Sequence, residues 1–297
     1  MSLIQIPIHK KIQNHIELGL LKLIRLLLVA MPLEVASGFM GKIWRLVAPR
    51  LKRHNRAIAN ITSAFPEKTT VECEHHVMDM WENLGRTFAE GFFLNKLIAQ
   101  HERFEINIEE MQAASRKLKI KGGVFVSCHS GNWELIGYPG LVHDIELGGV
   151  YQKIKNPLVD DYFVHQRKNL WPVGLHAKGQ QAARALLKIV KSGKCVGILA
   201  DLRDLRGIEV PFFHKSAPSN PFPAMLARTQ NVPLFAARCV RLPGVRFRFD
   251  IIELPVAQTD DRKRDIETTT ATIQKQIETW IREEPDQWMW GHRRWSR

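Results

Sequence analysis

Three short, nearly all-apolar runs bounded by glycine constrain the fold of this chain more than any other feature. They read KGGVFVSC at 121–128, GGVYQKI at 148–154 and KCVGILA at 194–200. Runs of this kind, without polar alternation, indicate strands that are buried on both faces. Helical stretches at 157–170 and 179–193 separate the second run from the third. Alternation of strands with helices indicates an α/β core.

Further strands extend this core. FEINI at 104–108, VPLFAARCV at 232–240 and VRFRFDII at 245–252 also have strand character, the last with strict alternation of apolar and charged residues. The chain has 297 residues, of which 45% are hydrophobic, and this supplies a sizeable core. We therefore predict an α/β fold with a mixed central sheet flanked by helices. Other helices are expected at 50–66, 68–100 and 264–285.

The N-terminal segment is strongly basic and rich in leucine. Residues 1–56 contain ten Lys or Arg but two Glu, which suggests a nucleic acid or an anionic membrane as partner, or else a basic soluble surface. The longest uncharged run near its middle, 26–33, is far shorter than the ~18 apolar residues of a spanning helix. We predict an amphipathic helix lying in the lipid interface. A short single pass and an ordinary buried helix are the alternatives. This divides the chain into a membrane-associating segment, 1–48, and a globular domain, 49–297.

A histidine follows the first of the apolar runs. His129 would lie at the C-terminal end of a buried strand, where ligand sites of α/β sheets commonly form. Ser130 and Asn132 are turn and cap residues, so a helix beginning near Asn132 would direct free N–H groups toward an oxyanion. A strand–turn–helix corner would fold Glu134 back onto the imidazole. Its carboxylate would then accept the ring N–H, and His129 would act as a general base.

Plainer interpretations of the same residues stay open. A histidine and a glutamate five positions apart also form purely structural pairs. Cys128, beside the histidine, could be a thiol nucleophile, but a cysteine that ends an apolar strand is typical of a core. No two of the four cysteines have the CxxC spacing, which argues against a disulfide framework or a cysteine-rich zinc site and favours a reducing compartment.

Several blocks of the sequence, in the same order, resemble one family. CHSGNWE at 128–134 resembles the HxxxxD/E motif of the glycerolipid and lysophospholipid acyltransferase superfamily, and most resembles the bacterial lipid A biosynthesis (lauroyl/myristoyl) acyltransferases. The resemblance covers nearly the whole chain and implies a glycerolipid-acyltransferase-like fold, called here the acyltransferase domain. The other matching blocks are RHNRAIANITSAFPE at 53–67, VYQKIKNPLVDDYFVHQR at 150–167, the long block at 197–237 and DQWMWGHRRW at 286–295.

This resemblance implies roles for the residues of the motif. His129 would be the general base, oriented by Glu134. It would deprotonate a hydroxyl of a lipid acceptor, which then attacks the thioester of acyl carrier protein or coenzyme A. Substrate-binding groups near the helix start, Ser130 and Asn132, would stabilise the tetrahedral oxyanion.

Three further substrate-binding candidates lie downstream. Arg167 would be the arginine that the family uses after its second strand, or else a surface residue of the 157–170 helix. Where the family has arginine in its VYRPL segment, this chain has Gln152, so Lys153 or Lys155 could supply the charge. Asp201 ends the strand at 194–200, where it could orient the acceptor or a basic side chain, or cap the following turn.

The resemblance further implies transfer of a fatty acyl chain to a hydroxyl of a lipid A precursor or a related glycolipid. The expected location is the cytoplasmic face of a bacterial inner membrane, with peripheral or single-pass attachment. Acyl carrier protein or coenzyme A would bring the acyl group, and the other partners would be the anionic membrane and the glycolipid acceptor. No cofactor, metal or nucleic acid is expected. Two other functions stay open: a basic nucleic-acid-binding protein with a structural His–Glu pair, and a lipid hydrolase on the same fold.

Overall fold

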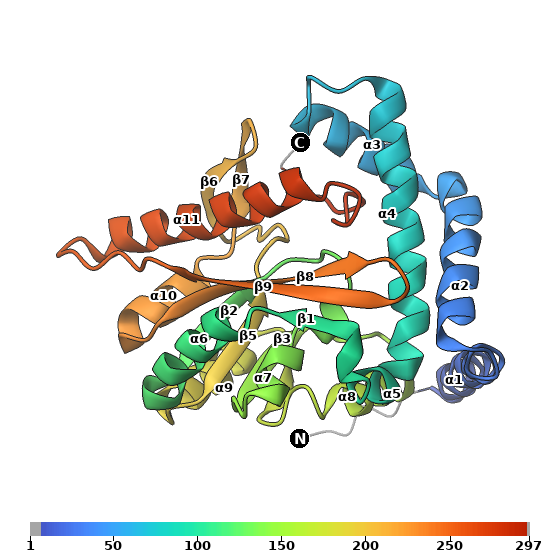
Figure 1. The fold of residues 1–297 in the computed structure, drawn as a ribbon, viewed down its shortest axis with the longest axis horizontal. Coiled ribbons are helices and arrows are strands. Elements are labelled where there is room, and N and C mark those ends of the chain that lie inside the picture. Colours follow the sequence, from blue (N-terminus) through green and yellow to red (C-terminus); the bar gives the residue numbers. More distant parts are fainter. Residues whose placement is uncertain (1–6, 296–297) are drawn as a thin grey trace.

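The computed structural model describes residues 7–295, which form a central sheet with helices on both faces and a helical layer along one end (Figure 1). The first six residues of the predicted 1–48 segment and the last two of the 49–297 domain lie outside the described residues. Helix α4 runs along the end of the sheet in Figure 1, with α2 beside it and α1 crossing at its lower end.

The predicted mixed sheet is confirmed. Seven strands follow the order β1-β9-β8-β2-β5-β3-β4, and β8 and β9 pair antiparallel whereas the other neighbours pair parallel. All six expected strands are present, and β4 joins them at the edge. The strands are β1 Phe104–Ile106, β2 Gly123–Ser127, β3 Leu147–Tyr151, β4 Gly174–Ala177, β5 Cys195–Leu199, β8 Leu234–Leu242 and β9 Arg246–Leu254.

A separate hairpin was not predicted. Strands β6, Ile208–Phe212, and β7, Lys215–Ser219, pair antiparallel and lie apart from the main sheet. Each contains a proline, Pro211 or Pro218, and proline within a run argues against a strand unless the strand lies at an edge. The two prolines explain why these strands were not predicted. They are tolerated because both strands of a two-stranded sheet are edge strands.

The longest helices agree with the sequence patterns. The predicted helix at 68–100 is divided, because α4 ends at Glu90 and a 3-10 turn leads into the short α5. Gly85, in the middle of α4, allows α2 to approach so closely that a Cβ there would lie 2.4 Å from the carbonyl oxygen of Met40. The helices are α1 Ile8–Val29, α2 Leu33–Val47, α3 Lys52–Ala64, α4 Thr70–Glu90, α5 Leu94–Ile98, α6 Ile108–Lys121, α7 Tyr138–Val142, α8 Pro157–Arg167, α9 Gln180–Lys191, α10 Phe222–Gln230 and α11 Arg262–Glu283.

The core has a layer on each face of the sheet. Val124 and Val126 of β2 are fully buried in the cluster formed with α9, α10 and α11. Phe125, between them, points to the opposite face and packs in the cluster that contains α6. Because β2 and β5 are parallel neighbours, the residues that follow their C-terminal ends emerge side by side. This places His129 and Asp201 at one edge of the sheet.

Candidate active site

The ring of His129 is held by Asp201. Nδ1 of His129 lies 2.8 Å from Oδ1 of Asp201, and the main-chain N–H of His129 donates to Oδ2 at 2.9 Å. Ring and backbone are thus fixed by a single carboxylate. The sequence had named Asp201 as a candidate that orients the acceptor or a basic side chain, and the structure places it against the imidazole.

Asp201 is fully buried and yet ionised. A third donor, Nε1 of Trp288, lies 2.8 Å from its Oδ2. Burial raises the pKa of Asp201, but the charge and hydrogen bonds of His129 lower it, and the net pKa lies well below the ordinary range. An ionised carboxylate can only accept at Nδ1, so the proton of a neutral ring sits on Nδ1 and the lone pair on Nε2. Within residues 7–295, no hydrogen bond engages Nε2.

A cavity of about 510 Å³ opens beside this histidine. Its walls are largely apolar and include residues of α6 and α9, and polar and charged side chains such as Glu134 and Arg167 also line it. Ser127, the last residue of β2, lines the cavity, and its buried hydroxyl has no hydrogen-bond partner among the described residues. The apolar part is lined by residues that include Met111, Phe125, Ile136, Ile145, Leu147, Trp171, Leu175, Leu186, Ile198 and Ile251.

Glu134 is not the partner of Nδ1 that the sequence predicted. Its carboxylate forms a two-point ion pair with Arg167, with Nε 2.5 Å from Oε2 and Nη2 2.7 Å from Oε1. The orienting contact of the His129 ring is therefore supplied by Asp201, from the neighbouring strand. Glu134, Arg167 and His129 nevertheless line the same cavity, so the motif does bring the three side chains to one site.

The expected helix after His129 is also shorter than predicted. A single 3-10 turn, Trp133–Leu135, follows the loop, and the next helix, α7, begins at Tyr138 and has five residues. Asn132 caps the turn, because its Oδ1 accepts the N–H of Glu134 at 3.1 Å. The expected row of free N–H groups at a long helix start is therefore absent from this corner of the described chain, since a proline and a glycine follow Tyr138 immediately.

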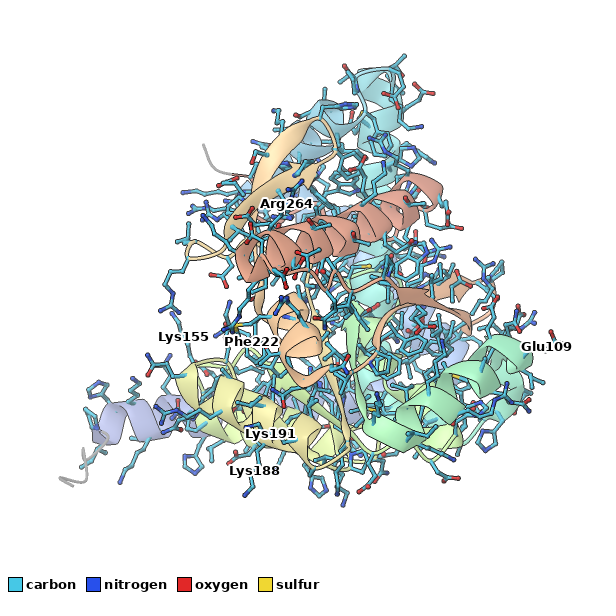
Figure 2. All side chains as sticks on the ribbon, turned by 90° about the vertical axis from the view of Figure 1, so that its left-hand side faces the viewer. Glu109, Lys155, Lys188, Lys191, Phe222 and Arg264 are labelled. Atoms are coloured by element: carbon cyan, nitrogen blue, oxygen red, sulfur yellow. The ribbon has the colours of Figure 1, made fainter. Side chains whose placement is uncertain are left out.

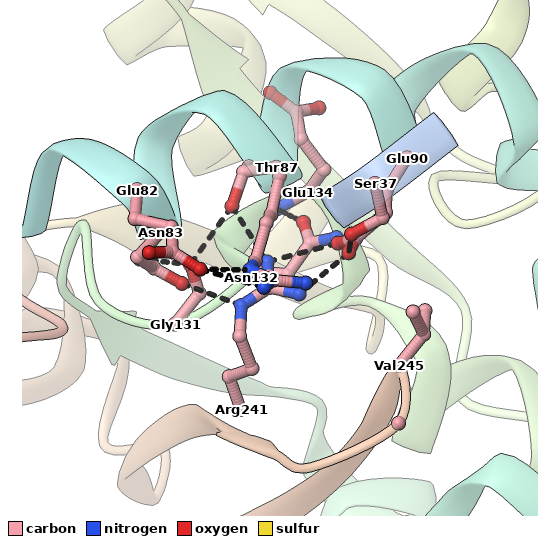
Figure 3. A network of polar contacts seen from close by, with 12 residues as sticks. Ser37, Glu82, Asn83, Thr87, Glu90, Gly131, Asn132, Glu134, Arg241 and Val245 are labelled. Carbon is pink, nitrogen blue, oxygen red and sulfur yellow. Dashed lines mark hydrogen bonds and ion pairs between the residues drawn. The ribbon is translucent and has the colours of Figure 1, made fainter. Parts of the chain in front are cut away.

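A buried network holds the loop between His129 and Glu134. The carboxylate of Glu90, fully buried at the end of α4, accepts from Asn132 at 2.7 Å, from Ser37 at 2.7 Å and from two nitrogens of Arg241 (Figure 3). Arg241 is also bonded to Asn83 and Thr87 of α4. Asn132, predicted to bind substrate, is thus engaged with protein groups on both sides of its amide.

Gly131 lets this loop approach the sheet. Its φ is +56°, and a Cβ at this position would lie 2.0 Å from the carbonyl oxygen of Cys239 on β8. Its own carbonyl oxygen accepts from Asn83 at 3.0 Å and from Thr87 at 3.1 Å (Figure 3). No residue with a side chain fits here without displacing a strand.

The C-terminal segment closes the loop from the other side. Ser130, another predicted substrate-binding residue, is buried and pairs through its backbone with Trp288 in an isolated antiparallel bridge. The N–H of Met289 donates to the carbonyl oxygen of His129 at 3.1 Å. The block that resembles the end of the family's sequence therefore supports the motif directly. Trp288 itself is fully buried and packs this segment onto the core.

The remaining candidates occupy different environments. Lys153 is exposed on the loop after β3, next to Gln152, which lines the cavity. Cys128 is fully buried, and burial raises the pKa of its thiol well above the ordinary value, as expected for a core residue and not for a nucleophile. Arg294 is buried beneath the β6–β7 hairpin and donates to the hydroxyl of Ser219 at 2.7 Å.

Sequence reasoning missed Glu90 and Arg241 because nothing near them forms a motif. Glu90 ends a long amphipathic helix, and Arg241 lies on a strand 151 residues away. The sequence did contain one indication: Glu90 and Arg241 are charged residues whose neighbours in the chain are apolar or small. A buried charge at such a position requires an opposite charge from elsewhere in the fold.

Comparison with known proteins identifies the family of this chain. The chain is 26% identical over 281 residues to "Lipid A biosynthesis lauroyltransferase" of Escherichia coli (strain K12), an alignment that covers 91% of this chain and 88% of that protein. The family described as "Bacterial lipid A biosynthesis acyltransferase" matches residues 11–297. That match includes every residue of the site described above, and the chain therefore belongs to the bacterial lipid A biosynthesis acyltransferase family.

Proposed function

We propose that this protein transfers a fatty acyl group from an acyl thioester to a hydroxyl of a lipid A precursor or a related glycolipid. The observation that carries the proposal is the position of His129 in a member of this family: Nδ1 is bonded to a buried carboxylate, while the cavity beside the ring has apolar walls. Acyl carrier protein and coenzyme A are both suitable carriers of such a thioester.

His129 would act as the general base. Nε2 takes the proton of the acceptor hydroxyl as its oxygen bonds to the thioester carbonyl carbon, and Asp201 stabilises the imidazolium that forms. The tetrahedral intermediate then collapses with cleavage of the C–S bond. The proton on Nε2 passes to the departing thiolate, so the ring returns to its starting state. The thioester is already activated, and the proposed reaction needs no metal or cofactor.

Glu134 would act through Arg167. The two-point ion pair keeps the guanidinium of Arg167 at the cavity, where a fixed positive charge lowers the energy of an oxyanion. The hydroxyl of Ser127 is a second donor that is available on the same wall. The two carboxylates of the site would therefore have different roles: Asp201 positions the base His129, and Glu134 positions the guanidinium of Arg167.

The cavity would hold the acyl chain in its apolar part. Trp171 lies across β3 and β5 at two glycines, since a Cβ at Gly149 or Gly197 would come within 2.6 Å or 2.8 Å of its indole ring. The indole thereby forms part of the floor of the cavity without obstruction by strand side chains. An apolar cavity of this kind favours a hydrocarbon over a polar group.

Helix α1 would place the protein on a membrane surface. Of the eight large apolar side chains exposed on α1, six recur at helical spacing along one face. Asn156, the N-cap of α8, donates to the carbonyl oxygen of Asn14 at 3.0 Å and fixes this orientation. None of the helices within residues 7–295 has both the length and the apolar character that a transmembrane span requires. The six residues along this face are Ile8, Ile12, Ile16, Leu20, Leu23 and Leu27.

Lipid mass spectrometry tests the proposal. Glycolipids are compared from cells that lack the gene and carry wild-type protein, the His129→Ala variant or an empty vector. An acyl mass increment present only with the wild-type protein supports the transfer and reports the chain length. If His129→Ala protein accumulates normally in the membrane fraction and the increment is unchanged, the role of His129 is refuted.

A further inference from the structure

A second cavity, of about 490 Å³, lies between the start of α3 and the C-terminal segment. Three of its lining residues, Lys52, Arg53 and Arg56, belong to the first turns of α3. The other three are consecutive in the C-terminal block, Gly291 to Arg293. This second cavity, which we call the basic cavity, has four Lys or Arg side chains and no carboxylate on its walls.

Three of the four cations of the basic cavity have no ion pair among the described residues. Arg56 donates to the carbonyl oxygen of Gly291 at 3.2 Å, which ties α3 to the C-terminal segment. The other three cations, Lys52, Arg53 and Arg293, form no ion pair with any residue between 7 and 295. Four like charges around one concave surface repel one another and produce a strong positive potential.

The helix itself adds to this potential. Leu51, the N-cap of α3, provides no side-chain hydrogen bond, and the first turn of the helix contains no acidic residue. Helix N-termini carry a partial positive charge, so basic residues in the first turn are unfavourable unless an anion is bound. Lys52 and Arg53 occupy that turn. Acidic residues are usually preferred in the first turn of a helix, so the basic residues at this position, beside the basic cavity, are unusual.

The basic cavity adjoins the catalytic histidine on one side and exposed apolar side chains on the other. His292 lies between the two cavities, with its ring centroid 5.3 Å from that of His129. On the other side, Leu46 and Val47 are exposed at the end of α2, and Leu51 is exposed immediately before Lys52. A ligand with an anionic head and an apolar body matches a basic cavity that has exposed apolar side chains beside it.

Building on the proposed acyl transfer, we infer that the basic cavity binds a phosphate group of a substrate and so places the reacting hydroxyl at His129. Guanidinium groups bind phosphate through paired, charge-assisted hydrogen bonds, and a helix start contributes further N–H donors. The two possible sources are the headgroup of the acceptor lipid and the phosphates of a coenzyme A donor. The continuity with the exposed end of α2 favours the lipid headgroup.

A charge-matched pair of variants tests this inference. Arg53→Gln with Arg293→Gln removes two cations from the cavity and leaves the Arg56 contact intact. Lys188→Gln with Lys191→Gln removes two cations from α9, which Figure 2 shows at the opposite end of the molecule from α3. Both proteins are assayed with an acceptor glycolipid that carries a phosphomonoester and with the same glycolipid after phosphatase treatment.

The inference predicts a loss that depends on phosphate. Each lost guanidinium contact raises KM for the phosphorylated acceptor about ten-fold, with kcat nearly unchanged, while KM for the dephosphorylated acceptor stays as in the wild type. The Lys188→Gln, Lys191→Gln protein keeps wild-type values for both. If the increase is instead confined to KM for acyl-coenzyme A, and 3′,5′-ADP competes with it in the wild-type protein, the phosphate belongs to the donor.

A binding measurement separates this inference from the proposed function. Wild-type and variant proteins are sedimented with phosphatidylcholine vesicles that contain phosphatidic acid, a phosphomonoester lipid, and no acyl donor. Weaker binding of the Arg53→Gln, Arg293→Gln protein supports the phosphate site even if no acyl transfer is found. Equal binding and equal KM values for all proteins refute it and leave the acyl transfer untouched. If the Arg53→Gln, Arg293→Gln protein differs from the wild type only in its KM for acyl-acyl carrier protein, the inference is also refuted. The basic cavity would then be a docking site for that acidic protein.

Discussion

The carboxylate of Asp201 is hydrogen-bonded to both the ring and the main chain of His129: Oδ1 lies 2.8 Å from the ring Nδ1, and Oδ2 accepts the main-chain N–H at 2.9 Å. Trp288 donates to Oδ2 as well. The carboxylate therefore fixes the tautomer of the ring and the course of the backbone at the end of β2. A group in this position must be an acceptor at both oxygens.

We expect Asp201→Asn to lower kcat by about a hundred-fold or more, because an amide accepts at one oxygen alone. Its NH2 group would face either the ring Nδ1 of His129 or, in the flipped orientation, both the main-chain N–H of His129 and Nε1 of Trp288, and either outcome disturbs the position of the ring. The measurement is kcat with saturating donor and acceptor, with the melting temperature recorded in parallel. Wild-type kcat in a correctly folded Asp201→Asn protein would mean that the contact does not position the base.

The ion pair between Glu134 and Arg167 makes a different prediction. Glu134→Gln and Arg167→Gln should each lower kcat/KM. The fold-decrease in the double variant should be much smaller than the product of the two single fold-decreases, with a coupling free energy of about 1–2 kcal/mol. The acidic limb of the pH profile of kcat/KM, where the general base becomes protonated, should stay at the same pH in Glu134→Gln. A shift of that limb, with additive losses, would instead restore the predicted contact of Glu134 with His129.

Gly131 offers a test of how tightly the loop must fit. Gly131→Ala places a methyl group where 2.0 Å separates it from a main-chain oxygen, at a φ of +56°. We expect a loss of about 3 kcal/mol or more in the free energy of unfolding, with loss of activity. Gly91→Ala is the matched control, since its Cβ would meet nothing within 4 Å. Similar stabilities of the two variants would show that β8 yields easily to the added methyl.

The sequence patterns predicted the sheet well and the site in part. Strands depend on local runs or alternation of apolar residues, so six of the seven strands were identified from such patterns. His129, Glu134, Arg167 and Asp201 were all selected, and the structure gathers them at one edge of the sheet. The pairing among them was wrong, because sequence distance favoured Glu134 as the partner of His129, whereas strand order places β5 beside β2.

The supporting charges could not be found from local pattern. Glu90 and Arg241 belong to α4 and β8, which meet through the packing of the whole molecule. The corner after His129 was expected to start a helix, but a helix that began near Asn132 could not continue through Pro139, and α7 begins only at Tyr138. Local composition thus gave the position of the loop, and tertiary packing decided which groups hold it.

His292 should make the protein less stable in acid. Burial, then the neighbouring charge of His129, lowers the pKa of His292 from 6.5 to about 4. Because the unfolded chain binds this proton at a higher pH than the folded chain, stability should fall as pH decreases from 6.5 to 4. We expect up to about 3 kcal/mol from this residue. The melting temperature of His292→Gln, followed across this range without phosphate in the buffer, should fall less steeply; parallel curves would contradict the assignment.

The exposed face of α1 predicts how the protein meets lipid. Ile16→Gln with Leu20→Gln should weaken sedimentation with anionic vesicles, because both apolar side chains point away from the core and would enter the interface. A matched control is Val71→Gln with Ile120→Gln, which changes side chains at least as exposed, 77% and 78%, on α4 and α6. Sedimentation of the control should equal that of the wild type. If both double variants lose binding equally, attraction to lipid is spread over the surface and α1 is not the site of attachment.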